Sequence, residues 1–201
     1  MKVKIFILKN VLFLLTVFFL ILFIQTCKKD SPTELNTDNS DTYYSKSSDT
    51  TSTYENYYFD IDKDGKTDYI FHHSYMITQT IPPASIESIY IKCLDSNQVN
   101  YSSAKRETRP ILDSIMIDDS IGWNIHSGVL GESSTTYTNN ANWLGYFVGI
   151  EPHNIGLRLN RQGSYYYGWV KALIMDDGKL KILNYAYKLT ANRSIMAGIH
   201  P

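Results

Sequence analysis

The sequence predicts an all-β fold, a single antiparallel β-sandwich of jelly-roll-like type that occupies residues 54–201. From Tyr54 onward, β-branched and aromatic residues dominate and form runs with the length of strands. Clusters of Asp, Asn, Ser and Gly separate these runs, as turns do between strands. No run keeps the 3.6-residue apolar period of a helix over about ten residues. A stretch of about 150 residues is the size of one domain with a single core.

Residues 1–26 are typical of a lipoprotein signal peptide. Three lysines form a basic head, namely Lys2, Lys4 and Lys9. The almost unbroken apolar run Val11–Ile24 has the length of a signal-peptide core and is shorter than the ~20 residues of a membrane-spanning helix. An uncleaved membrane anchor is the alternative, because Ile5–Leu8 could extend the run.

The segment Ile24–Cys27 resembles the lipobox of bacterial lipoproteins, in which the cysteine becomes the lipidated first residue. The following Lys28–Asp30 is similar to the tails of lipoproteins in certain Gram-negative bacteria, some of which display them on the cell surface. The resemblance implies an outer-membrane-anchored, extracytoplasmic lipoprotein that meets the membrane through lipid on Cys27. Cys93 then has no disulfide partner, and its strand-like surroundings predict a small buried side chain.

Residues 27–53 are rich in Ser, Thr, Asp and Asn and contain scarcely any aliphatic side chain. Such a segment buries too little apolar surface to offset the entropy lost on ordering. The sequence therefore predicts a flexible tether that holds the domain away from the membrane.

The domain is expected to contain strands at Asp68–Ile81, Ile86–Leu94, Ile111–Ile117, Trp143–Ile150, Ile155–Leu159, Tyr165–Met175 and Leu180–Leu189. The last two strands flank Asp176–Lys179, whose Asp-Gly pair predicts a hairpin. Both faces of Tyr165–Met175 carry large side chains, so both faces of this strand are expected to be partly covered.

The stretch 60–68 reads D-x-D-x-D-G-x-x-D and predicts a calcium loop. Four carboxylates so close together repel one another unless a positive charge lies among them. The expected ligands are oxygen atoms of Asp60, Asp62, Asp64, Lys66 (through its carbonyl) and Asp68. The loop resembles the calcium loops of dockerin modules and, because a strand follows, those of FG-GAP-type repeats. The alternative is an Asp/Gly-rich surface turn.

A second resemblance involves the C-terminal part of the chain. The motifs Tyr167–Val170, Asn184–Tyr187 and Ile195–Gly198 are similar to those of a group of largely uncharacterised secreted bacterial β-proteins. Trp143–Phe147 and the Asp-rich loop also fit that group. The resemblance supports the fold and an extracytoplasmic location, and it implies no known reaction.

Charge and motifs narrow the possible functions. Without the three signal lysines the chain has 16 basic and 20 acidic residues, a net charge of −4, which argues against nucleic acid as a partner. Hydrolase, metalloprotease and phosphate-binding motifs are missing, so an enzyme is not favoured. His72 and His73 are neighbours on a strand and are expected to point to opposite faces.

The favoured interpretation is a calcium-stabilised surface module that binds a glycan or a surface protein, or acts in adhesion. Tyr and Trp suit such surfaces, and Trp123 and Trp143 lie in or beside Gly122–Asn142, which is predicted to be a ligand-binding loop. One alternative is a carbohydrate-active enzyme or an accessory glycan-binding component. Another is a purely structural protein of the cell envelope.

Overall fold

The computed structural model describes residues 41–47, 55–103, 107–136 and 139–199. The predicted signal peptide, the lipidation site Cys27 and most of the predicted tether lie outside these ranges. Within them, no helix has the length and apolar character needed to cross a bilayer.

The described residues form antiparallel sheets and no α-helix. Across the six-stranded sheet the strands are β1 (Thr42–Lys46), β12 (Leu180–Lys188), β11 (Ser164–Ile174), β10 (His153–Arg161), β5 (Gln98–Asn100) and β7 (Trp123–Asn124). Across the five-stranded sheet they are β2 (Tyr57–Phe59), β3 (Tyr69–Ile77), β4 (Ala84–Cys93), β8 (Ser127–Thr136) and β9 (Asn139–Leu144). A two-stranded sheet pairs β6 (Met116–Ile117) with β13 (Ile195–Met196).

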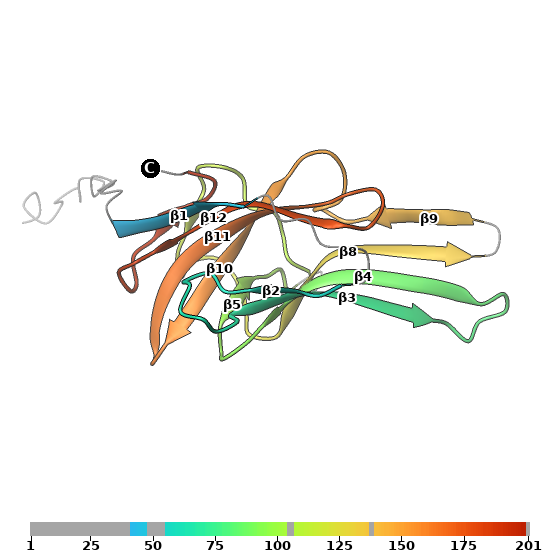
Figure 1. Cartoon of the computed structure of the whole chain (residues 1–201), viewed down its shortest axis with the longest axis horizontal. Coiled ribbons are helices and arrows are strands. Elements are labelled where there is room, and N and C mark those ends of the chain that lie inside the picture. Colours follow the sequence, from blue (N-terminus) through green and yellow to red (C-terminus); the bar gives the residue numbers. More distant parts are fainter. Residues whose placement is uncertain (1–40, 48–54, 104–106, 137–138, 200–201) are drawn as a thin grey trace, which may run out of the picture. The chain divides into compact units, whose positions relative to one another are not determined.

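The two large sheets pack face to face, which confirms the predicted all-β sandwich (Figure 1). The main core between them takes Phe59, Phe71 and Ile91 from the five-stranded sheet, all at most 1 % exposed. From the six-stranded sheet it takes inward residues such as Leu157 and Val170, which are fully buried. Within the six-stranded sheet, β10, β11 and β12 follow one another as neighbours.

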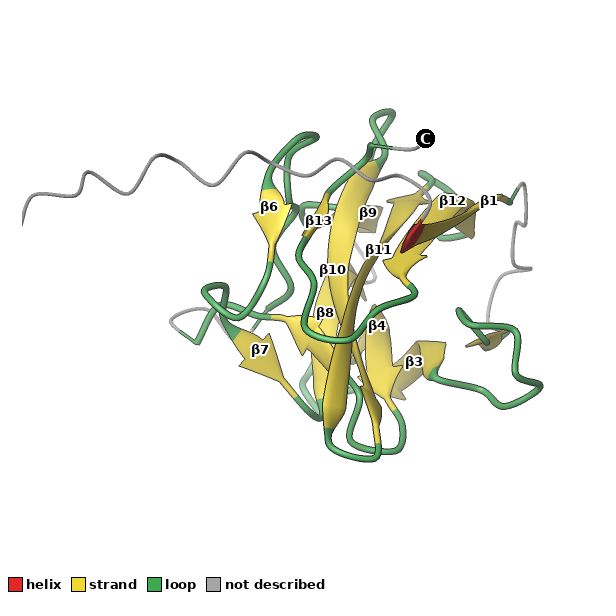
Figure 2. Cartoon of the chain, turned by 90° about the vertical axis from the view of Figure 1, so that its left-hand side faces the viewer, coloured by secondary structure: helices red, strands yellow, loops and turns green. Residues whose placement is uncertain are grey.

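The other face of the six-stranded sheet is also buried. Tyr167 and Trp169 on β11 alternate with the inward Val170 and pack against Ile117 of β6 and Ile195 of β13. This second cluster is called the outer core below, and Figure 2 shows β6 and β13 beside β10. The structure thus confirms that both faces of β11 are covered.

The prediction of a flexible tether over residues 27–53 is wrong for residues 42–46, which form β1. This strand pairs with β12, with Tyr43 opposite Tyr187 and Tyr44 opposite Ala186. Tyr43 packs against the main core, and Tyr44 packs against the outer core. The segment has scarcely any aliphatic residues, but its two adjacent tyrosines bury apolar surface, one on each face of the sheet.

The prediction of a loop at Gly122–Asn142 is also wrong. Its residues form β7, β8 and part of β9, and β8 pairs with β4 along its whole length. Low β-propensity is overridden here because both backbone edges of β8 are satisfied, by β4 on one side and β9 on the other. Conversely, the strand predicted at Trp143–Ile150 ends at Leu144. Positive φ angles at Gly145 (142°) and Gly149 (131°) turn the backbone there.

The strand predicted at Ile111–Ile117 is shorter than expected. Ile111 forms only a bridge to Asn154 of β10, and the strand β6 contains only Met116 and Ile117. Between them Ser114 has a φ of 67°, which interrupts extended backbone.

The C-terminal hairpin is confirmed. β11 and β12 pair antiparallel, with a register shift between Lys171 and Ala172. The turn is closed by hydrogen bonds from Gly178 N to Met175 O (2.8 Å) and from Met175 N to Lys179 O (2.9 Å). Gly178 has a φ of 77°, and a Cβ there would lie 2.8 Å from the Trp143 ring. The predicted Asp-Gly turn therefore also supports Trp143.

Candidate metal centre

The Asp-rich loop joins β2 to β3 at one end of the five-stranded sheet. A hydrogen bond from Asp68 N to Phe59 O (2.9 Å) closes it at its base. Positive φ angles at Lys63 (60°) and Gly65 (91°) reverse the chain inside the loop. The Gly65 N–H donates to Asp60 Oδ2 at 2.9 Å, which draws the Asp60 carboxylate over the loop.

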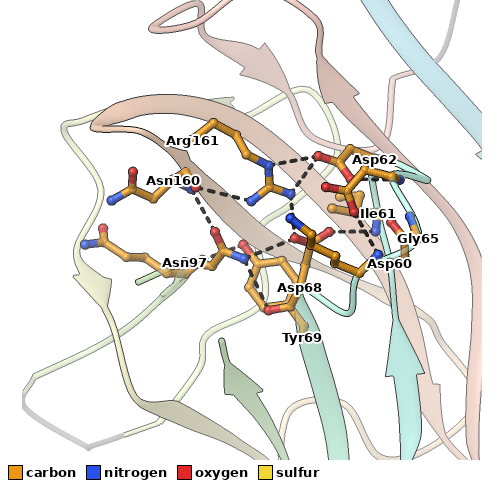
Figure 3. A network of polar contacts seen from close by, with 12 residues as sticks. Asp60, Ile61, Asp62, Gly65, Asp68, Tyr69, Asn97, Asn160 and Arg161 are labelled. Atoms are coloured by element: carbon orange, nitrogen blue, oxygen red, sulfur yellow. Dashed lines mark hydrogen bonds and ion pairs between the residues drawn. The ribbon is translucent and has the colours of Figure 1, made fainter. Parts of the chain in front are cut away.

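Three of the predicted ligands converge. Carboxylate oxygens of Asp60, Asp62 and Asp68 all lie within 4.8 Å of one another (Figure 3). Asp68 is 3 % exposed, and Asp60 Oδ1 is buried without a hydrogen-bond partner among the described residues. These three residues are called the Asp triad below.

Asp64, a further predicted ligand, is placed differently, and the Lys66 carbonyl stays a predicted ligand. Asp64 Oδ1 accepts a hydrogen bond from the Lys66 N–H at 2.8 Å, and both residues are exposed. Asp64 is not one of the three residues whose oxygens come together. The local geometry thus uses Asp64 to shape the turn.

Arg161 supplies a positive charge to the Asp triad. Its Nη2 donates to Asp62 Oδ2 and to Asp68 Oδ1, each at 2.6 Å, and its Nε donates to Asp62 Oδ2 at 3.0 Å. Arg161 is the last residue of β10, so this contact fastens the loop of one sheet to a strand end of the other. Arg161 thus supplies one positive charge among three carboxyl groups, and Lys63 of the loop is attracted electrostatically to Asp60.

Asp68 is the centre of the network. Besides Arg161, it accepts a hydrogen bond from Ile61 N at 3.0 Å and one from Asn97 Nδ2 at 3.3 Å. Asn97 is fully buried, and its Oδ1 accepts from Asn160 N at 2.8 Å. The network therefore joins the loop, the segment before β5 and the end of β10 (Figure 3).

Burial and the ion pair shift the pKa values of Asp68 and Arg161 in opposite directions. Burial raises the pKa of the Asp68 carboxyl, and the hydrogen bonds from Arg161 and Ile61 oppose that rise. Burial would lower the pKa of Arg161, but its hydrogen bonds to Asp68 and Asp62 outweigh burial and raise it. The guanidinium is thus charged at any physiological pH. Its charge favours the ionised form of the neighbouring Asp68 carboxyl, which burial disfavours.

Sequence reasoning missed Arg161, Asn97 and Asn160. No local motif marks them, since Arg161 and Asp68 are 93 residues apart in the chain. The one signal that could have pointed to Arg161 was the concentration of four carboxylates in the loop. The two lysines within the loop do not lie at ligand positions and offset these carboxylates only in part. A counter-charge from elsewhere in the chain was therefore to be expected.

Trp123 and Trp143 lie on different sheets and are both half-buried. Trp123 packs against the outer core, donates its indole N–H to Asp118 O at 3.1 Å and lies 4.9 Å from the Arg158 guanidinium. Trp143 packs against the main core, with its ring 5.8 Å from that of His73. Each tryptophan therefore supports the fold, and the structure does not bring the two together.

His72 and His73 point to opposite faces of β3, as predicted. The His72 ring lies 4.8 Å from the Tyr90 ring, whereas His73 Nε2 lies 3.6 Å from Glu87 Oε2 on the other face. Burial lowers the pKa of His73, and the nearby Glu87 opposes this effect. His73 shares the face of β3 that carries the core residue Phe71, and His72 lies on the opposite face.

Comparison with protein-family models, with curated proteins and with solved structures found no match to this chain. The resemblance of its C-terminal motifs to secreted β-proteins therefore stays a prediction.

Proposed function

We propose that this protein is an extracytoplasmic lipoprotein whose β-sandwich is stabilised by calcium and serves as a surface binding module. The Asp triad carries the proposal. It combines three converging carboxylates, a buried Asp60 oxygen without a partner among the described residues, and more carboxylates than the single guanidinium of Arg161 can pair. Oxygen ligands that carry negative charge suit a hard divalent cation.

The ion has a structural role in this proposal. Arg161 already joins Asp62 to Asp68, so the cation binds Asp60 together with the remaining carboxylate oxygens of the triad. It then holds the start of β3 to the end of β10 more firmly than the arginine alone. Calcium sites of extracellular modules have dissociation constants of ~10⁻⁴–10⁻³ M. Calcium outside the cytoplasm is concentrated enough to occupy a site of this affinity.

Calcium is expected to raise the melting temperature of the detergent-solubilised full chain. At about ten times the dissociation constant, binding to the folded state alone contributes roughly 1.4 kcal/mol, which corresponds to about 3–6 °C for a domain of this size. Thermal unfolding followed by circular dichroism, with calcium and with a chelator, measures this shift.

Two matched variants locate the ion. Asp60→Asn is expected to abolish the calcium shift, because it removes the charge of a carboxylate whose buried oxygen accepts no hydrogen bond from the residues that the structure describes. Asp64→Asn is expected to retain the shift, because Asp64 lies outside the triad. A wild-type chain whose melting temperature is the same with calcium and with chelator would refute the site.

The location rests on Cys27 and the preceding apolar run. Cys27→Ala is expected to prevent lipidation and to move the protein from the membrane fraction to the soluble fraction of a Gram-negative host. Metabolic labelling with a fatty-acid analogue, followed by fractionation, measures both effects. Cys93→Ala is the matched control, because Cys93 is buried and its loss leaves lipidation intact. Labelling that persists in Cys27→Ala would contradict the anchor.

Binding, rather than a purely structural role, is favoured by a concave surface on the five-stranded sheet. A groove of about 380 Å³ is lined by residues of β4, β8 and the turn after β9. This volume falls in the usual range of ligand pockets.

A further inference from the structure

The hairpin formed by β3 and β4 projects past the end of the six-stranded sheet (Figure 1). Tyr75 and Ile77 alternate with the core residue Phe71 on β3, so they lie on the face that packs against the six-stranded sheet nearer the start of the strand. They are nevertheless 54 % and 63 % exposed, which agrees with the projection seen in Figure 1. The far end of the hairpin is thus accessible even on its core face.

The exposed side chains at this end are apolar on every side. Met76 lies on the face of β3 opposite Ile77 and is 56 % exposed. Ile81, in the turn between the two strands, is 99 % exposed. Tyr75, Met76, Ile77 and Ile81 are called the apolar tip below. Because they lie on both faces and at the end of one hairpin, a flat partner surface would cover only some of them. Their arrangement suits surroundings that enclose the tip.

The apolar tip lies in an uncharged stretch of the chain. Residues 74–86 include no Asp, Glu, Lys, Arg or His, although Asp, Glu, Lys and Arg make up 19 % of the whole sequence. Such a stretch loses no ionic hydration when it leaves water, and that loss is the largest cost of burying a protein surface. The tip therefore suits an apolar environment and has no side-chain charge with which to attract an ionic partner.

Polar groups of the turn bond within the hairpin. Thr78 N donates to Ala84 O at 2.7 Å, and Ala84 N donates to Thr78 Oγ1 at 3.0 Å. The Thr78 and Thr80 hydroxyls lie 2.7 Å apart, and Thr80 Oγ1 donates to Pro82 O at 3.0 Å. Pro82 and Pro83 have no N–H group to satisfy. Moving these groups out of water therefore costs less than it would for an ordinary turn.

A lipid bilayer combines the properties that the apolar tip requires. It surrounds an inserted element on all sides, and it accepts apolar side chains about 5–10 Å deep while backbone groups still reach water and headgroups. Tyrosine suits the headgroup level, where Tyr75 would lie at the base of the tip. An enclosing groove on a partner protein is the competing occupant. Protein interfaces usually add directional hydrogen bonds, whereas the hydroxyl groups of this turn already bond within it.

The position of the tip selects between two bilayers. β1 begins at the opposite end of the sandwich from the β3–β4 hairpin (Figure 1). In the lipoprotein proposed above, the chain runs from the anchor at Cys27 to β1. The apolar tip is then directed away from the membrane that carries the anchor and toward any membrane that faces it.

We propose that the apolar tip inserts into the headgroup region of a lipid bilayer facing the one that holds the anchor. The proposal deepens the surface binding module, because it gives the module a facing membrane as its partner. It rests on the proposed anchor only for the choice between the two bilayers. Insertion itself is argued from the hairpin.

Fluorescence quenching between two vesicle populations tests the insertion. The full chain, with a fluorescent amino acid at position 79 of the turn, is anchored on preformed phosphatidylcholine vesicles. These are mixed with protein-free phosphatidylcholine vesicles whose lipids carry a nitroxide quencher. Quenching by the second population is expected. It is expected to be equal at low and high salt, because the inserted stretch has no charged side chain.

Three variants examine the end and the two faces of the hairpin, namely Ile81→Asp, Met76→Asp and Ile77→Asp. Each is expected to raise the vesicle concentration for half-maximal quenching about ten-fold or more, since an aliphatic side chain that enters the bilayer becomes a charge. Ile150→Asp is the matched control, because Ile150 is 90 % exposed in a turn outside the hairpin. It is expected to behave as the wild type. Melting temperatures of all four variants check that each one folds.

Four results would overturn the proposal. The first two are no quenching by the protein-free vesicles and quenching that Ile81→Asp leaves unchanged. The third is a loss in only one of Met76→Asp and Ile77→Asp, which would indicate contact through one face with a second copy or another protein. The fourth is quenching only when the quencher is placed in the anchoring vesicles.

Flotation of the anchoring vesicles separates failure of the tip from failure of the anchor. A chain that floats with its vesicles and shows no quenching retains the proposed anchor and loses the inserted tip. A chain that does not float refutes the anchor. The same chain, mixed directly with the quencher vesicles, then tests insertion of the tip by itself.

Discussion

Replacing Asp68 with alanine is expected to lower the free energy of unfolding by roughly 3 kcal/mol in chelator-containing buffer. The carboxylate is 3 % exposed and receives hydrogen bonds from Arg161, Ile61 and Asn97. Its removal leaves a buried N–H, a buried amide and a partly buried guanidinium without this acceptor. Urea unfolding followed by tryptophan fluorescence measures the loss.

Asp64→Ala is the matched control for Asp68→Ala. It removes a carboxylate from the same loop, but the side chain is exposed and, within the described part of the chain, accepts the local Lys66 N–H. The expected change is within about 1 kcal/mol. Equal losses in the two variants would contradict a network centred on Asp68. The chelator separates this result from calcium binding, because the contact with Arg161 is present without an ion.

Replacing Trp169 with alanine is expected to cost about 3–5 kcal/mol, the usual range for deleting a buried tryptophan. Trp169 is fully buried on the face of the six-stranded sheet that points away from the main core. Its ring lies 6.3 Å from that of Tyr44 on β1. A loss of this size is a large part of the 5–15 kcal/mol that stabilises a typical domain. Urea or thermal unfolding measures it.

Two variants control for the Trp169 result. Trp169→Phe keeps an aromatic ring and removes an indole nitrogen that has no hydrogen-bond partner among the described residues, so it is expected to cost much less than alanine. Tyr58→Ala removes a tyrosine that is 63 % exposed and is expected to change stability by less than about 0.5 kcal/mol. A cost below about 1 kcal/mol for Trp169→Ala would mean that the outer core contributes little.

The strands β3, β4, β10, β11 and β12 were predictable because their residues carry the pattern locally. Leu180–Lys188 ends one residue before its predicted range, and Ser164–Ile174 differs from its predicted range by one residue at each end. The Asp-Gly turn between them has a strong local preference. Gly122–Asn142 was misread because its small polar residues have low β-propensity. Pairing with β4 decides its structure, and no residue inside the segment reveals that partner.

The candidate metal centre was predictable only in part. The D-x-D-x-D-G spacing identified the loop and all three members of the Asp triad. It could not separate Asp64 from them, since the same spacing allows that carboxylate either to face the ion or to cap the turn. The groove at Tyr146 and Glu132 was not predicted, because its lining comes from strands that meet only in the folded sheet.

The sequence by itself determined the all-β class, the C-terminal hairpin and the position of the acidic loop. Each of these depends on alternation or turn chemistry within a few neighbouring residues. Only the tertiary structure decided that Arg161 pairs with Asp62 and Asp68, that Trp169 is buried in a second core and that β1 completes the sheet edge. These contacts join residues far apart in the chain, and their proximity follows from strand order and register, which no local pattern encodes.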